Sequence, residues 1–231
     1  MKNKRTGNLM VENILVTGAA VSVIQSFLFW VIALSALGLG IDRFLTTGFA
    51  SLHQVKPWLF FVLCGAFVLI AMLGLAITPA EQRLIEKFEG GLVAWGANLA
   101  CLGHMATIAI FSWWIWFMTQ SQTDLAASIA ADQIVPISWA VMFELFFVGL
   151  WVWIFVYVIA RHGNLSKGFL VVSILKATSF WLTFVAFILN AKLLLIIGLA
   201  GAAVIFGPLW HLWIAVIFRR TDCSEIHSSI G

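Results

Sequence analysis

Charged side chains are scarce in this sequence. Only 10% of its 231 residues are charged, 62% are hydrophobic, and the mean hydropathy is +1.05. Soluble domains carry about a quarter charged residues, so this composition excludes a water-soluble fold of this length. The formal charge of +3 therefore indicates lysine and arginine held on the cytoplasmic side of a membrane, and it does not point to nucleic acid as a partner.

Cysteines and sequence motifs of known chemistry are also few. Cys64 and Cys101 lie inside apolar runs and Cys223 lies near the C-terminal end, so the cysteines predict no disulfide framework. The sequence contains no phosphate-binding glycine loop, metalloprotease helix motif or nucleophile elbow. Cys223 and His227 together supply only two metal ligands. We therefore predict no catalytic residue, cofactor or metal site and favour a protein that is not an enzyme.

Long hydrophobic runs dominate what remains. A membrane-spanning helix needs about 20 apolar residues, and a barrel strand would alternate polar and apolar residues, which these runs do not. The sequence predicts an all-α integral membrane protein with a single domain over residues 1–231, built as a bundle of six transmembrane helices. The predicted spans are residues 15–40, 58–78, 91–118, 137–160, 168–190 and 193–218. We interpret the first as a retained helix and not as a signal peptide.

Two short interfacial helices are expected between the spans. Thr78-Pro79-Ala80-Glu81 is typical of a helix start, with a threonine cap, proline in the first turn and a glutamate that reaches back to the cap. We expect this helix to end at Gly90-Gly91. Ser121 and Asp124 predict the start of a second such helix, on the outer surface.

The basic residues predict the orientation. With the N-terminus inside, nine of the thirteen lie in cytoplasmic segments, and only Arg43, Lys56 and Lys192 lie outside. This bias is what the positive-inside rule expects, so we predict cytoplasmic N- and C-termini in a bacterial inner (plasma) membrane. The nine are Lys2, Lys4, Arg5, Arg83, Lys87, Arg161, Lys167, Arg219 and Arg220.

Aromatic residues gather near the predicted span ends, as amphipathic rings do at headgroup level. The expected outer belt contains Trp58, Trp113, Trp114, Trp116 and Trp139, and the expected inner belt contains Trp95, Trp153, Tyr157, Trp210 and Trp213.

Four ionisable residues fall inside the predicted spans: His104, Glu144, Lys176 and His211. Such a residue costs at least about 2.5 kcal/mol at mid-span, which makes each one a candidate for an ion pathway. From a rise of 1.5 Å per residue, His104 lies near the middle of its span and Glu144 about 10 Å from the outer face. Lys176 and His211 lie about 12 Å and about 10 Å from the inner face. The four form a ladder across the membrane if their helices face one another.

Lys176 has the most informative surroundings. Ser173, Lys176, Ser179, Thr183 and Asn190 share about a third of one helix's circumference. This polar stripe indicates a face turned to the bundle or to a wet cavity. The alternative is that the hydroxyls bond to their own backbone while Lys176 extends to the inner surface. The two interpretations carry equal weight.

Glu144 requires a partner or a proton. It is either neutral and hydrogen-bonded to a neighbour or engaged in carrying protons or cations, and a pair with Lys176 is one arrangement. Gln25 adds a polar group to the first span, beside Ser22 and Ser26.

Each histidine has a structural alternative. His104 lies on a helix face of small residues and is expected to bond across a helix interface. His211 follows Gly207-Pro208, which should kink its helix. Haem ligation by this pair is disfavoured, because their predicted depths differ by roughly 9 Å.

Three functions fit these features. The favoured one is transport of a small solute or ion, with proton coupling as one form of it. The second is a non-catalytic structural or assembly subunit of a larger membrane complex, and the third is a membrane-embedded lipid-modifying enzyme, which ranks last because no second catalytic group is predicted at the depth of His104 or Glu144. The expected partners are the lipid bilayer and a further copy of the chain or a membrane complex.

Overall fold

Every regular element that the structure describes is a helix, which confirms the all-α prediction. The computed structural model describes residues 2–39, 53, 56–120, 137–162 and 166–228. The elements are α1 (Lys2–Leu39), α4 (Pro57–Gln120), α6 (Ile137–His162), α7 (Lys167–Ile188), α8 (Lys192–Ala200), the π-helix η1 (Gly201–Phe206) and α9 (Gly207–Ser228).

Five helical stretches of the described residues are long and apolar enough to cross a membrane. By length and hydropathy the chain is therefore a multi-pass membrane protein. The stretches are Val16–Ser35, Pro57–Gln120, Ser138–His162, Lys167–Ile188 and Lys192–Arg220.

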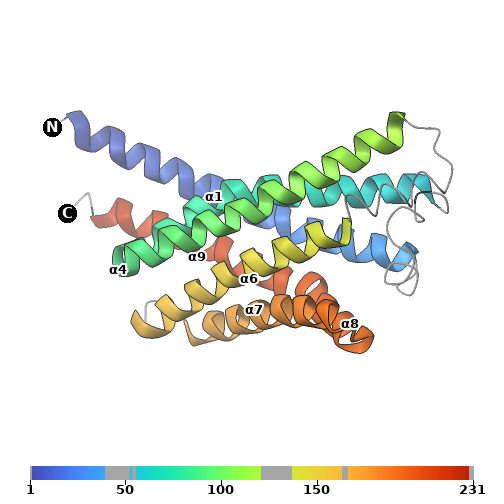
Figure 1. Ribbon diagram of the computed structural model, residues 1–231. Coiled ribbons are helices and arrows are strands. Elements are labelled where there is room, and N and C mark those ends of the chain that lie inside the picture. Colours follow the sequence, from blue (N-terminus) through green and yellow to red (C-terminus); the bar gives the residue numbers. More distant parts are fainter. Residues whose placement is uncertain (1, 40–52, 54–55, 121–136, 163–165, 229–231) are drawn as a thin grey trace.

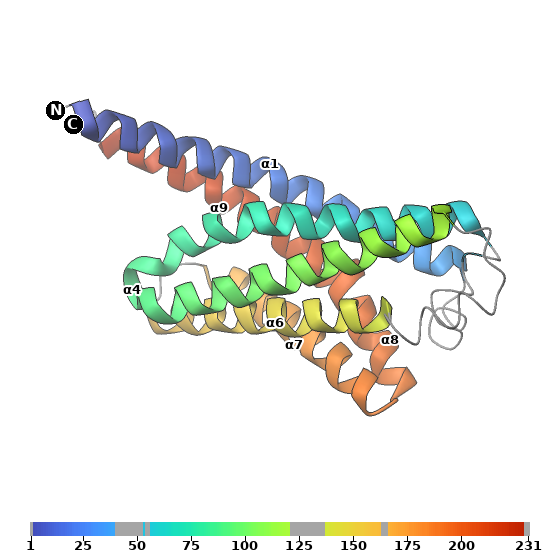
Figure 2. The ribbon, with the colours of Figure 1, turned by 45° about the horizontal axis from the view of Figure 1, so that its top comes forward.

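Helix α4 consists of two helical segments that fold back on each other (Figures 1 and 2). They meet at Glu89, where the backbone leaves the helical conformation with φ −144° and ψ 54°. The Glu89 carboxylate accepts a hydrogen bond from Arg161 at 3.0 Å and lies 3.7 Å from His162, both at the end of α6. These contacts attach the turn of α4 to α6.

The predicted interfacial helix after Thr78 is wrong. Helix α4 continues through Pro79, and the Thr78 hydroxyl donates to the Gly74 carbonyl at 2.8 Å instead of capping a helix. The apolar face of α4 extends through the buried Ala80 and Ile85, and this burial outweighs the hydrogen bond that proline removes. The break falls at Glu89, one residue before Gly90-Gly91. The other expected interfacial helix, at Ser121 and Asp124, lies outside the described residues.

Two large apolar clusters lie toward the two ends of the bundle, and a small third cluster of Val152, Val156 and Ala177 joins α6 to α7. The first gathers the start of α4, its last turns, the start of α6 and parts of α1, α7 and α8, with Phe60 and Trp114 among its buried members. The second gathers the middle of α4, the rest of α6, the start of α7 and α9, with Phe155 and Phe218 fully buried. Between the two large clusters lies a layer, here called the polar layer, that contains the buried side chains of Gln25, Glu81, His104, Lys176 and His211.

Helices α1 and α9 run side by side, and the N- and C-terminal ends lie close together (Figures 1 and 2). The kink expected at Gly207-Pro208 takes the form of η1, a π-helical turn immediately before it. Pro208 has no N–H to offer to Val204, four residues earlier. The Val204 carbonyl instead accepts from the Trp30 indole at 3.0 Å, and the Pro208 carbonyl accepts from Ser26 at 3.1 Å. Helix α1 thus bonds to the backbone at the irregular turn.

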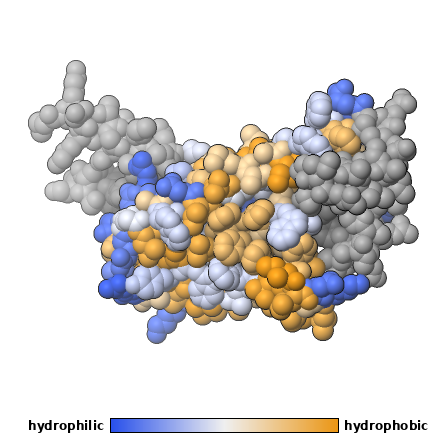
Figure 3. Space-filling model, viewed as in Figure 1, coloured by the Kyte–Doolittle hydropathy of each residue, from blue (hydrophilic) through white to orange (hydrophobic). Residues whose placement is uncertain are grey.

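Hydrophobic side chains cover the middle of the visible face, with hydrophilic ones toward its two ends (Figure 3). Of the predicted belts, Trp58, Trp95, Trp116, Trp139 and Trp153 are exposed. Two belt predictions are wrong, because Trp114 and Trp210 are buried in the core. Sequence position near a span end therefore does not separate lipid-facing rings from core rings.

Candidate functional site

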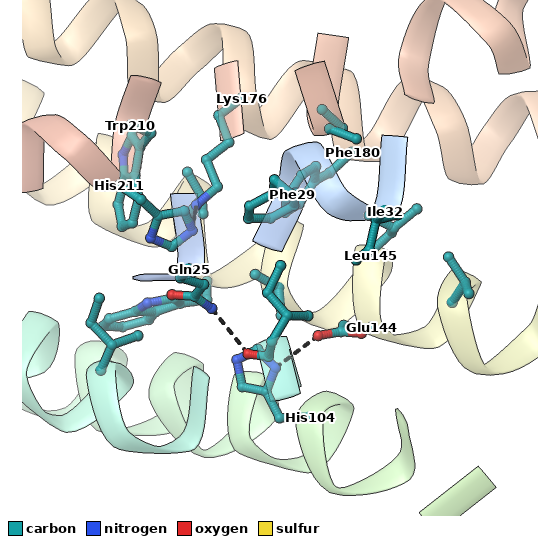
Figure 4. Close-up of a pocket in the computed structure, with 18 of the residues that line it drawn as sticks. Gln25, Phe29, Ile32, His104, Glu144, Leu145, Lys176, Phe180, Trp210 and His211 are labelled. Carbon is teal, nitrogen blue, oxygen red and sulfur yellow. Dashed lines mark hydrogen bonds and ion pairs between the residues drawn. The ribbon is translucent and has the colours of Figure 1, made fainter. Parts of the chain in front are cut away.

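A cavity of about 80 Å³ lies in the polar layer between the two apolar clusters. Every described helix of the bundle contributes to its wall: Gln25 from α1, Glu81 and His104 from the two segments of α4, Glu144 from α6, Lys176 from α7 and His211 from α9. The volume is sufficient for a few water molecules or a small solute. All four ionisable residues predicted for a membrane pathway, and Gln25, line this one cavity (Figure 4).

His104 and Glu144 form a pair across α4 and α6. His104 Nδ1 lies 3.0 Å from Glu144 Oε1. The His104 ring lies directly over Gly74 of the other α4 segment, where an added Cβ would come within 2.3 Å of the ring. A Cβ added at Gly103 would lie 3.1 Å from the Phe147 Cβ and 3.4 Å from the Glu144 Cα, so α6 packs closely against α4 beside this pair. The expected hydrogen bond of His104 across a helix interface is present.

Lys176 is held inside the bundle and does not extend to the inner surface. It is only 2% exposed, and its Nζ lies 3.5 Å from the centre of the Trp210 ring and 3.3 Å from His211 Nε2. A cation over an indole face is stabilised by the ring's electrons. A pair of Glu144 with Lys176 was one arrangement considered from the sequence, but the contacts pair Glu144 with His104 and Lys176 with His211.

Glu81 is the cavity residue that the sequence interpretation missed. It is 2% exposed, and its Oε2 accepts a hydrogen bond from the Trp151 indole at 2.7 Å. Glu81 also interacts electrostatically with Lys176 and with His104. The sequence does contain a pattern that indicates a buried Glu81. This residue lies one helical turn from Ile77 and one from Ile85, which are both apolar and buried.

Two polar atoms at the cavity have no hydrogen-bond partner within the part of the chain that the structure describes: Gln25 Oε1 and His211 Nδ1. Gln25 uses its amide Nε2 to donate to the Ile70 carbonyl at 3.1 Å, so its oxygen remains as an acceptor. The Nζ of Lys176 lies 3.3 Å from His211 Nε2. An ammonium group can only donate, so in a pair with charged Lys176 a neutral His211 carries its proton on Nδ1, which is then the donor without a partner. An occupant with one donor and one acceptor would satisfy both atoms.

The two remaining predicted site residues, Ser173 and Thr183, lie outside the cavity wall. Both are fully buried, and each hydroxyl donates at 2.8 Å to the backbone carbonyl four residues earlier. Both interpretations of the polar stripe are therefore partly right. The stripe faces the bundle from Ser173 to Thr183, although its hydroxyls bond to their own helix, and only Asn190 is exposed. Ser173 also accepts from the Trp210 indole at 2.9 Å, which holds the ring beneath Lys176.

The lining differs from a metal site. Among the described residues, no three His, Cys, Asp or Glu side chains lie close enough together to hold a metal ion. The cavity instead combines two carboxylates, a lysine and two imidazoles, groups that exchange protons with one another and with a solute.

No protein-family model matches the chain, and neither the curated proteins nor the solved structures contain a significant match to it.

Proposed function

We propose that the chain is a carrier of a small solute or ion and that it is coupled to protons. The observation that carries this proposal is the convergence of Glu81, His104, Glu144, Lys176 and His211 on one cavity in the interior of the bundle. Each ionisable side chain is costly to keep among membrane-spanning helices, and such residues mark substrate and proton pathways. An interior cavity built from several helices is also where transporters bind their substrates.

We propose six transmembrane spans with both termini in the cytoplasm of a bacterial inner membrane. In support, each of the two α4 segments, on either side of Glu89, is longer than the about 20 residues that a span requires. Arg83 and Lys87 lie near the turn of α4 and Arg161 at the end of α6, which agrees with an inner side rich in basic residues.

In this carrier, Glu144 is the group through which the cavity exchanges protons with water. Its side chain is 12% exposed, compared with 6% for the side chain of His104. A proton that enters at Glu144 passes to His104 at 3.0 Å. Alternating access requires a part that moves, and the irregular turn at η1 and Gly207-Pro208 supplies a point where α9 can pivot.

The test is proton movement in vesicles that contain the purified full chain and a trapped pH dye. A gradient of small solutes, added singly, should drive proton flux for one class of solute. Glu144→Gln and Lys176→Met should each reduce this flux at least about tenfold, whereas Glu86→Gln, at an exposed position of α4, should not change it. Unchanged flux in both cavity variants, with normal insertion and folding, would exclude the carrier function in this form.

One observation favours a second candidate, the lipid-modifying enzyme. It ranked last because no second group was predicted at the depth of His104 or Glu144, yet these two lie 3.0 Å apart in the geometry of an acid–base pair. A change in lipid classes on overexpression of the chain, lost in Glu144→Gln, would favour this enzyme over the carrier.

The assembly-subunit hypothesis makes a separate prediction. Mild extraction from the native membrane should then yield stoichiometric partner chains, held by exposed aromatic residues such as Trp95 and Trp116. A chain that purifies alone would argue against it.

A further inference from the structure

We propose that the solute of the central cavity is a small organic ammonium ion that exchanges for a proton. This inference rests on the proposed carrier function and names its substrate class. It depends on the charge balance of the cavity and on its two unsatisfied polar atoms.

The ionised cavity carries an excess of one sign. When both carboxylates and Lys176 are ionised and both histidines are neutral, Glu81 and Glu144 oppose the single ammonium group of Lys176, and this charge state has one unbalanced negative charge. An unpaired charge in a dry interior is expensive. The cavity therefore favours the uptake of one positive charge, either as a proton or as a cation.

His104 is the residue that binds this proton. His211 already accepts from Lys176 at 3.3 Å, so a proton on its Nε2 would set two positive charges against each other. Lys176 in turn balances Glu81. A proton on His104, by contrast, completes an ion pair with Glu144 at 3.0 Å. The titratable groups that share the cavity with His104 are Glu81 within α4, Glu144 on α6, Lys176 on α7 and His211 on α9, and α1 contributes the neutral Gln25. A proton on His104 is therefore opposed by Lys176 and favoured by the two carboxylates, and it requires that His211 stays neutral.

A cation that enters the cavity supplies the same charge. His104 then releases its proton, because both together would leave a positive excess. Binding of the cation and of the proton are therefore mutually exclusive, exchange is electroneutral, and the affinity for the cation rises as the pH rises.

The unpartnered donor and acceptor of the cavity suit an organic ammonium ion. No metal-binding group of three side chains occurs among the described residues. Gln25 Oε1 is an unpartnered acceptor on a side chain that is 4% exposed, and it suits an N–H donor. The free donor at His211 Nδ1 suits a hydroxyl oxygen of the solute. Phe29, Phe67 and Phe180 also line the cavity, and aromatic side chains favour an organic cation.

Calorimetry of the purified full chain tests the proposal. Ethanolammonium chloride, which has an ammonium group and a hydroxyl, is titrated into the protein near pH 7 in two buffers of different ionisation enthalpy. We expect binding with release of about one proton per chain, seen as a buffer-dependent heat. Glycolate, an anion of similar size, should not bind. Binding of glycolate in place of ethanolammonium, or cation binding without proton release, would overturn the proposal.

Two variants test which residue supplies the excess negative charge and which one binds the exchanged proton. Glu81→Gln should weaken ethanolammonium binding about tenfold or more, because it removes the excess negative charge. His104→Gln should still bind the cation, without the buffer-dependent heat. Glu86→Gln, exposed on the same helix as Glu81, should behave like the unaltered chain. Proton release that persists in His104→Gln would overturn the assignment, even if Glu81→Gln fails to fold.

The outcome also separates this inference from the carrier function. If ethanolammonium does not bind but another solute drives proton flux that Glu144→Gln abolishes, the substrate class is wrong and the carrier function stands. If ethanolammonium binds with proton release and no solute drives flux, the cation site stands and the carrier function fails.

Discussion

At the scale of single residues, the cavity depends on small side chains as much as on charged ones. His104 occupies space that is free only because residue 74 is glycine, and its distance to Glu144 follows from that position. Glu81 and Lys176 are likewise held by indoles, one donating to the carboxylate and the other lying beneath the ammonium group. The chemistry therefore depends on residues that carry no charge.

Gly74→Ala should displace the His104 ring. The added Cβ would lie 2.3 Å from that ring, so we expect a loss of stability of about 1–3 kcal/mol and loss of proton flux. Gly65→Ala is the matched control, because a Cβ at that position of the same α4 segment has no neighbour within 4 Å. Thermal unfolding in detergent and the vesicle assay measure both effects, and equal behaviour of the two variants would contradict this placement of His104.

At the scale of the helices, the sequence predicted the apolar helical runs better than it predicted the positions where helices end or are interrupted. The cost of ionisable groups in lipid was enough to single out His104, Glu144, Lys176 and His211. Glu81 was missed because Pro79 resembles a helix start. Whether helix α4 ends there depends on burial of Ala80 and Ile85 against other helices, which local sequence does not encode. The pairing of His104 with Glu144 was equally hidden, since it depends on how close α4 and α6 approach at Gly103.

The junction of η1 and α9 allows a double-mutant test. Trp30→Phe removes the indole that donates to the Val204 carbonyl at 3.0 Å, and we expect it to cost about 1 kcal/mol of stability. Pro208→Ala restores an N–H four residues after Val204. In that background the cost of Trp30→Phe should be smaller, because the new N–H offers the carbonyl another donor. Chemical unfolding of the four proteins measures the coupling, and strict additivity would show that Trp30 does not replace the missing donor.

At the scale of the whole molecule, the proposed six-span arrangement places the turn of α4 and its far end on opposite sides of the membrane. Glu86 lies near the turn and Gln120 at the far end, and both are exposed. In a background without Cys64, Cys101 and Cys223, Glu86→Cys should react with an impermeant maleimide only from the cytoplasmic side. Gln120→Cys should react only from outside. Labelling of both from one side would contradict the six-span arrangement.

The division of the core into two clusters also bears on how the bundle moves. The two large apolar clusters bind the helices together near each end, whereas the layer between them contains a cavity and is therefore less completely filled. Relative tilting of the helices disturbs least packing if it occurs across that layer. The depth at which a solute would bind is then also the depth of weakest cohesion. An occupant that joins the facing side chains would act as a temporary crosslink between the two ends, so its arrival and departure would change the stiffness of the whole bundle.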